Sequence, residues 1–77
     1  MAQTVFIEAI NQAISEEMAR DENVFIMGED IRRGVYGATQ NLLDDYGEKR
    51  VLDTPLSENG FFGAAIGASL VGMRPIV

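Results

Sequence analysis

One carboxylate, Glu58, stands where a strand gives way to a helix, and this position suits proton chemistry. It lies in the segment 50–60, RVLDTPLSENG, which leads from a short strand into a glycine-rich helix that starts near Ser57. If Phe61 and Phe62 keep water away, the desolvated carboxyl holds its proton more easily and can exchange it with a ligand nitrogen. In the structural alternative, Glu58 only complements the helix dipole, a contribution of about 0.3–1 kcal/mol. Position alone favours this second interpretation.

Two further carboxylates, Glu29 and Asp30, follow the apolar run 24–27 and Gly28. An apolar run of this length between polar turns predicts a strand that is buried on both faces. In parallel α/β sheets, ligands bind at the carboxyl ends of the strands. Glu29 and Asp30 are therefore candidate site residues by position.

The residue types that the sequence lacks exclude several kinds of chemistry. It holds no cysteine and no histidine, so disulfides, thiolate metal sites, and Ser-His or Cys-His catalysis are not available within it. Its net charge of -6, from 12 acidic and 6 basic residues, argues against a nucleic-acid surface. The basic pairs Arg32-Arg33 and Lys49-Arg50 lie beside carboxylates, and we interpret them as solvated loop charges.

No segment has the pattern of a targeting or membrane sequence. Residues 1–20 lack a basic region followed by a continuous apolar one. The longest nearly apolar stretch, 60–73, is shorter than the roughly 20 residues that span a bilayer. We therefore expect a cytoplasmic protein that binds no membrane.

Apolar spacing and turn residues divide the chain into helices and strands in an α/β pattern. The first helix is expected to use Thr4 as its cap. Its core-facing stripe consists of Val5, Phe6, Ala9, Ile10, Ala13, Ile14 and Met18. A loop over 31–38 then precedes a short helix over 39–46, which Gly47 ends, and a short strand follows at 51–53.

The helix that starts near Ser57 is apolar on all sides, which is typical of a buried helix. Gly60, Gly63 or Ala64, and Gly67 fall on one of its faces. Each interior glycine costs about 1 kcal/mol of helix propensity relative to alanine. Tight packing against a neighbouring element or subunit is the simplest compensation. Because the sequence stops in an apolar strand that begins at Arg74, and so exposes an unpaired edge, we expect the chain to be cut short.

Six short motifs follow one another between residues 28 and 75. They are Gly28-Glu29-Asp30, Tyr36-Gly37-Ala38-Thr39, Tyr46-Gly47-Glu48-Lys49-Arg50-Val51, Asp53-Thr54-Pro55-Leu56-Ser57-Glu58, Gly63-Ala64-Ala65-Ile66-Gly67-Ala68 and Gly72-Met73-Arg74-Pro75. In this order and spacing, the sequence resembles the beta subunit of the decarboxylating component of 2-oxo acid dehydrogenase complexes, the group of the pyruvate, branched-chain and acetoin dehydrogenases. Any one motif is weak, but the ordered set is specific.

This resemblance implies that residues 1–77 are the N-terminal portion of a transketolase-like pyrimidine-binding domain, a parallel sheet flanked by helices that binds thiamine diphosphate. The glutamate that matches Glu58 hydrogen-bonds the cofactor's aminopyrimidine, and proton exchange there activates the cofactor for attack on the 2-oxo acid. Leu56 and Ser57 match positions that line the pyrimidine pocket, and Glu29 matches a residue beside the cofactor. Phe61 and Phe62 are expected to be core residues.

The resemblance also implies partners. An alpha subunit would hold the cofactor's diphosphate and its Mg²⁺ in an alpha2beta2 heterotetramer, so this chain has no metal ligands of its own. The acyl group from a 2-oxo acid such as pyruvate would pass to lipoamide on the acyltransferase core of the complex. Because half of the site is missing, we expect the 77-residue chain to be inactive alone.

Two alternatives remain at this stage. The first is a segment of a single-chain relative such as transketolase or deoxyxylulose-phosphate synthase, in which this domain follows a diphosphate-binding domain. Met1 opens directly into the first helix, which favours a separate beta subunit. The second alternative is a non-catalytic α/β module whose glycine-rich helix serves only as a subunit-docking surface.

Overall fold

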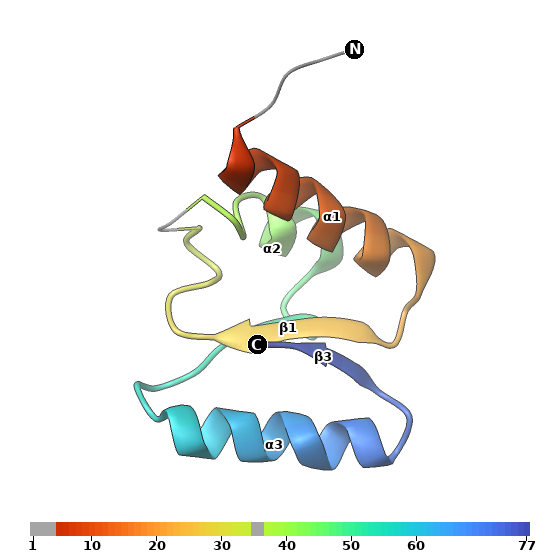
Figure 1. The fold of residues 1–77 in the computed structure, drawn as a ribbon, viewed down its shortest axis with the longest axis vertical. Helices are drawn as coiled ribbons and strands as arrows, with labels where there is room; N and C mark the ends of the chain where they lie inside the picture. The colour runs from red at the N-terminus through yellow and green to blue at the C-terminus, as the bar shows by residue number, and fades with distance from the viewer. Residues whose placement is uncertain (1–4, 35–36) are drawn as a thin grey trace.

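The computed structural model describes residues 5–34 and 37–77, which form a three-stranded parallel sheet with helices on both faces (Figure 1). In chain order, the elements are α1 (Phe6–Arg20), β1 (Val24–Gly28), α2 (Leu42–Tyr46), β2 (Val51–Asp53), α3 (Glu58–Leu70) and β3 (Arg74–Ile76). Helices α1 and α2 cover one face of the sheet and α3 lies on the other. The predicted α/β fold is confirmed. The expected cap Thr4 and the loop residues 35–36 lie outside the described residues.

Strand β1 is the central strand of the sheet, whose order is β2-β1-β3. Its residue Ile26 pairs with Val51 of β2, and its residue Val24 pairs with Arg74 of β3. Val24, Phe25 and Ile26 are all buried because helices lie above and below them. The prediction of a strand buried on both faces is confirmed.

The hydrophobic core lies between the sheet and the helices α1 and α2. It consists of Met18, Val24, Ile26, Leu42 and Val51, with Ile14, Ile31, Leu43, Tyr46 and Ile76 packed around it. The predicted stripe on α1 reaches this core only through its second half, and the residues of its first turn are exposed. The reason is geometric, because α1 slopes away from the sheet towards its N-terminus (Figure 1).

Helix α2 is shorter than predicted. Asn41 adopts a left-handed conformation with φ of 68°, which separates residues 39–41 from the helix that begins at Leu42. The predicted end of the helix is confirmed, since Gly47 has φ of 84° and its N–H donates to the Leu43 carbonyl.

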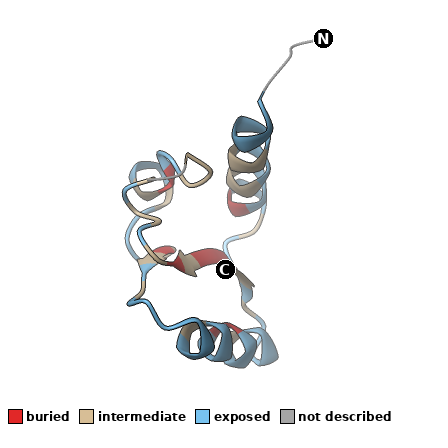
Figure 2. Cartoon of the chain, turned by 60° about the vertical axis from the view of Figure 1, so that its left-hand side comes forward, coloured by how far each residue is buried: buried red, intermediate tan, exposed pale blue. Residues whose placement is uncertain are grey.

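Helix α3 is mostly exposed, so the prediction of a buried helix is wrong for this chain. Ala65 is buried, whereas Ile66 and Leu70 are 62% and 82% exposed. The sheet covers one side of α3 and leaves the rest open (Figure 2). A Cβ atom added at Gly63 or Gly67 would meet nothing within 4 Å, so no described element packs against the glycine face. Packing of another subunit there stays a prediction.

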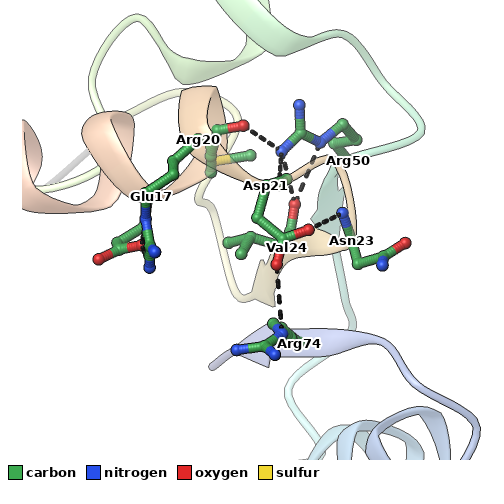
Figure 3. A network of polar contacts seen from close by, with 8 residues as sticks. Glu17, Arg20, Asp21, Asn23, Val24, Arg50 and Arg74 are labelled. Carbon is green, nitrogen blue, oxygen red and sulfur yellow. Dashed lines mark hydrogen bonds and ion pairs between the residues drawn. The ribbon is translucent and has the colours of Figure 1, made fainter.

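The Arg50 side chain contacts the end of α1, the start of β1 and helix α2, and Figure 3 shows its hydrogen bonds to the first two. Its guanidinium donates to the carbonyl oxygens of Met18 at 2.6 Å, Asp21 at 3.0 Å and Val24 at 2.9 Å. It also lies 5.1 Å from the centre of the Tyr46 ring in α2. The last carbonyls of a helix have no partner within the helix, and this side chain satisfies two that lie at the end of α1. Its interpretation as a solvated loop charge is therefore wrong.

Replacement of Arg50 by methionine is expected to destabilise the complete protein by about 2–3 kcal/mol, because the half-buried carbonyls at the end of α1 lose their donor. The measurement is urea unfolding followed by circular dichroism. Lys49→Met is the matched control, since Lys49 is the exposed neighbour and its replacement removes the same charge. Equal stability of the two variants would contradict the assigned role of Arg50.

Candidate functional site

A cavity of about 530 Å³ opens at the carboxyl ends of the strands. The turn after β1 brings Glu29 to its wall, and the first turn of α3 brings Glu58. Apolar side chains form most of the remaining lining, including Phe61, Phe62 and Val77. The structure thus brings two of the candidate acids together in largely apolar surroundings.

Glu58 is the first residue of α3, with Ser57 at the N-cap position. A carboxylate there benefits from the helix dipole, as the structural interpretation requires. Glu58 is also exposed, so Phe61 and Phe62 do not by themselves remove it from water. Their rings lie 5.2 Å apart; Phe61 is half-buried and Phe62 is 48% exposed. The prediction that these two phenylalanines are core residues is therefore wrong.

A second cavity, of about 300 Å³, lies beside the first. Its lining consists of Met27, Thr54, Pro55, Ser57, Gly60 and Phe61. Met27 and Phe61 line both cavities. Of the expected cofactor-binding residues, Glu29 and Glu58 line the larger cavity and Ser57 lines the smaller one. Leu56 is 76% exposed and lines neither of these two cavities.

Thr54 is a polar lining residue that was not among the candidates expected from the sequence. Its backbone N–H donates to the Gly28 carbonyl at 2.8 Å. Its hydroxyl oxygen is buried and has no hydrogen-bond partner among residues 5–34 and 37–77. A buried hydroxyl without a partner costs about 1–3 kcal/mol, so this oxygen suits a water molecule or a polar ligand atom. Its position directly after β2, at the carboxyl end of a parallel strand, could have indicated Thr54 as a site residue.

The turn that carries Glu29 is tied to β2 by Arg32. The Arg32 backbone N–H donates to the Asp53 carboxylate at 2.8 Å, and its guanidinium donates to the Val51 carbonyl at 2.7 Å. The interpretation of Arg32 as a solvated charge is therefore wrong, whereas its neighbour Arg33 is exposed. Asp53 could have indicated this contact from the sequence, because a carboxylate at a strand end accepts hydrogen bonds from backbone N–H groups of the adjacent loop.

Within the described part of the chain, no group of three acidic side chains is placed to hold a metal ion. The helices found there are also too short or too polar to cross a membrane.

Residues 3–77 match the family described as transketolase, pyrimidine binding domain. Because this match spans nearly the whole sequence, the chain belongs to that family. The two acids at one edge of a parallel sheet thus lie within a pyrimidine-binding domain.

Within this family, the chain is similar to beta subunits of 2-oxo acid dehydrogenases. The chain is 53% identical over 72 residues to the pyruvate dehydrogenase E1 component subunit beta of Rickettsia bellii, with 91% of this chain and 22% of the relative covered. It is also 53% identical over 73 residues to the 2-oxoisovalerate dehydrogenase subunit beta of Bacillus subtilis, covering 92% and 22%. The mitochondrial pyruvate dehydrogenase E1 subunit beta of Bos taurus is 51% identical over 71 residues, covering 90% and 20%. The chain spans about a fifth of the length of these curated relatives.

Replacement of Thr54 by valine, which has the same shape but no hydroxyl, is expected to stabilise the ligand-free complete protein by about 1 kcal/mol, because an unpaired polar atom is removed from the interior. Urea unfolding compares the variant with wild type. Thr54→Ser keeps the hydroxyl and is expected to bring no stabilisation. A loss of stability in Thr54→Val would indicate that a bound water already satisfies the hydroxyl.

Proposed function

We propose that the complete protein is a thiamine-diphosphate-dependent 2-oxo acid dehydrogenase and that this chain is part of its beta subunit. The observation that carries the proposal is the meeting of Glu29 and Glu58 at one apolar cavity, in a chain of the transketolase pyrimidine-binding family. Residues 1–77 form the N-terminal portion of that pyrimidine-binding domain. The relatives named above are beta subunits, which supports this assignment over a single-chain transketolase.

The lining of the cavities fits an aminopyrimidine ring. Ligand pockets are mostly apolar with a few placed polar groups, and about 300–1,000 Å³ is their usual size. Phe61 and Met27, which line both cavities, offer apolar surface to the ring. The unpartnered Thr54 hydroxyl and the carboxyl groups of Glu29 and Glu58 offer polar contacts to its nitrogens. In this proposal Ser57, at the N-cap of α3, and Leu56, which precedes it and lines neither cavity in the chain alone, flank the ring.

Glu58 is the catalytic residue of the proposal, because its carboxyl exchanges a proton with a ring nitrogen of the pyrimidine. When bound, thiamine diphosphate supplies the carbon nucleophile that removes carbon dioxide from a 2-oxo acid such as pyruvate. Glu58 is suited to this exchange by its place at the cavity, because a carboxyl there can both accept and return a proton.

A partner completes the site in this proposal. The cofactor's diphosphate and Mg²⁺ are held by an alpha subunit, in an alpha2beta2 assembly that passes the acyl group to lipoamide on the acyltransferase core. Coverage of the exposed apolar face of α3 by a subunit would bury Ile66 and Leu70 and would remove water from the helix that carries Glu58. The 77-residue chain alone is then inactive, because it contributes half of the cofactor site.

Replacement of Glu58 by alanine in the complete beta chain, assembled with its alpha partner, is expected to lower 2-oxo acid decarboxylation by about 100-fold or more, because the proton partner of the cofactor is lost. Carbon dioxide release from pyruvate and from 2-oxoisovalerate is the measurement. Glu22→Ala, at an exposed glutamate before β1, is the matched control. Full decarboxylation by an intact Glu58→Ala assembly would refute the role of Glu58.

Leucine at Gly63 or Gly67 is expected to weaken subunit association by about tenfold or more, because overpacking a close contact costs about 1–3 kcal/mol. The isolated chain has open space at both positions, so its own packing is not disturbed. Light scattering over a dilution series measures the association, and thermal unfolding checks the folded state. Unchanged association in both variants would show that the glycine face is not covered by a subunit.

A further inference from the structure

Side-chain and backbone hydrogen bonds of Arg32 fasten the turn that carries Glu29. Residues 29–34 form successive turns directly after β1. Two hydrogen bonds from Arg32 tie this turn to β2, its backbone N–H to the Asp53 carboxylate at 2.8 Å and its Nε to the Val51 carbonyl at 2.7 Å. A third, from its Nη2 to the Glu48 carbonyl at 2.8 Å, ties the turn to the loop before β2. The turn therefore cannot move without breaking contacts to a second strand and the loop before it.

The backbone beside Glu29 turns sharply. Asp30 has φ of 54°, in the left-handed region that, apart from glycine, mainly asparagine and aspartate adopt. Such a conformation persists when the surrounding contacts impose it, and it occurs often at ligand sites. Arg32, two residues further on, supplies contacts to β2 that hold this turn.

The other end of the same loop has a separate anchor. The Asn11 side chain in α1 donates to the Ala38 and Gln40 carbonyls at 2.8 and 3.0 Å. Loss of Arg32 therefore releases the part of the loop next to Glu29, while the part next to α2 stays in place. Arg32 and Asp53 are also absent from the hydrophobic core, whose residues come from α1, β1, α2 and β2.

We propose that Arg32, together with Asp53, is a positioning residue that holds the Glu29 carboxyl in the cavity that Glu58 also lines. This inference rests on the proposed function, since it makes the Arg32 contacts a device for cofactor binding. Arg32 does not line that cavity, so it acts through Glu29. The competing role is a purely structural one, comparable to that of Arg50.

The test measures thiamine diphosphate binding, with Mg²⁺ present, to the complete assembled protein by isothermal titration calorimetry. Arg32→Met is expected to raise the Kd about tenfold, because a displaced supporting contact misplaces the group it holds. Arg32→Lys, which keeps a charge and a donor, is expected to recover part of the loss. Arg33→Met is the matched control, because it removes the same charge from an exposed neighbour, and its Kd is expected to equal that of wild type.

A double-mutant cycle with Glu29→Gln separates positioning from general stabilisation. If Arg32 acts through Glu29, Arg32→Met raises the Kd of the Glu29→Gln protein by no more than about twofold. A full tenfold rise in both backgrounds would show a purely structural role and overturn the inference. Should Arg32→Met fail to assemble, Asp53→Ala removes one acceptor only and must show the same dependence on Glu29; if it does not, the inference fails.

Failure of the inference is distinguishable from failure of the proposed function. If wild type does not bind thiamine diphosphate and Glu58→Ala changes no activity, the proposed function falls and the inference falls with it. If wild type binds the cofactor but Glu29→Gln or Arg32→Met binds it equally well, the positioning role alone is refuted.

Discussion

The candidate site depends on the parallel pairing of β1 with β2. Parallel strands need a crossover connection, and the segment that contains α2 returns the chain so that both strands end at the same edge. The register sets Gly28 opposite Asp53, so the segments that follow these two residues begin side by side. Glu29 and Glu58 therefore reach one cavity, although α2 and β2 lie between them in the sequence. Without this pairing, neither acid has a neighbour with which to form a site.

The sequence predicted those features that local chemistry or element order determines. The apolar run before Gly28 became a central strand because its residues can be buried on both faces. Gly47 ends α2 because glycine adopts the positive φ required there, and Ser57 precedes α3 as expected. The convergence of Glu29 and Glu58 was also predictable, because the rule for parallel sheets needs only the order of the elements.

The features that the sequence did not predict depend on contacts between distant segments. Arg32 and Arg50 were interpreted as surface charges because their partners are mainly backbone carbonyls, which carry no sequence signature. The apolar composition of α3 indicates burial but does not say which molecule provides it, and the sheet covers only the side that contains Ala65. The exposure of Phe62 has the same cause. Tertiary context, and not propensity, decides all of these positions.

The contacts of Arg50 also link α1, β1 and α2 to one another, whereas α3 has no part in the hydrogen bonds of this side chain within the described residues. The end of α1, the start of β1 and α2 share this one cation and one hydrophobic core, so a local opening of any of them loosens the others. Helix α3 contributes no residue to that core and packs mainly on β3. Of the two acids of the site, Glu29 follows a strand that belongs to this core, whereas Glu58 lies on a helix outside it. A partner that covers α3 would therefore act on the spacing between the two acids through Glu58.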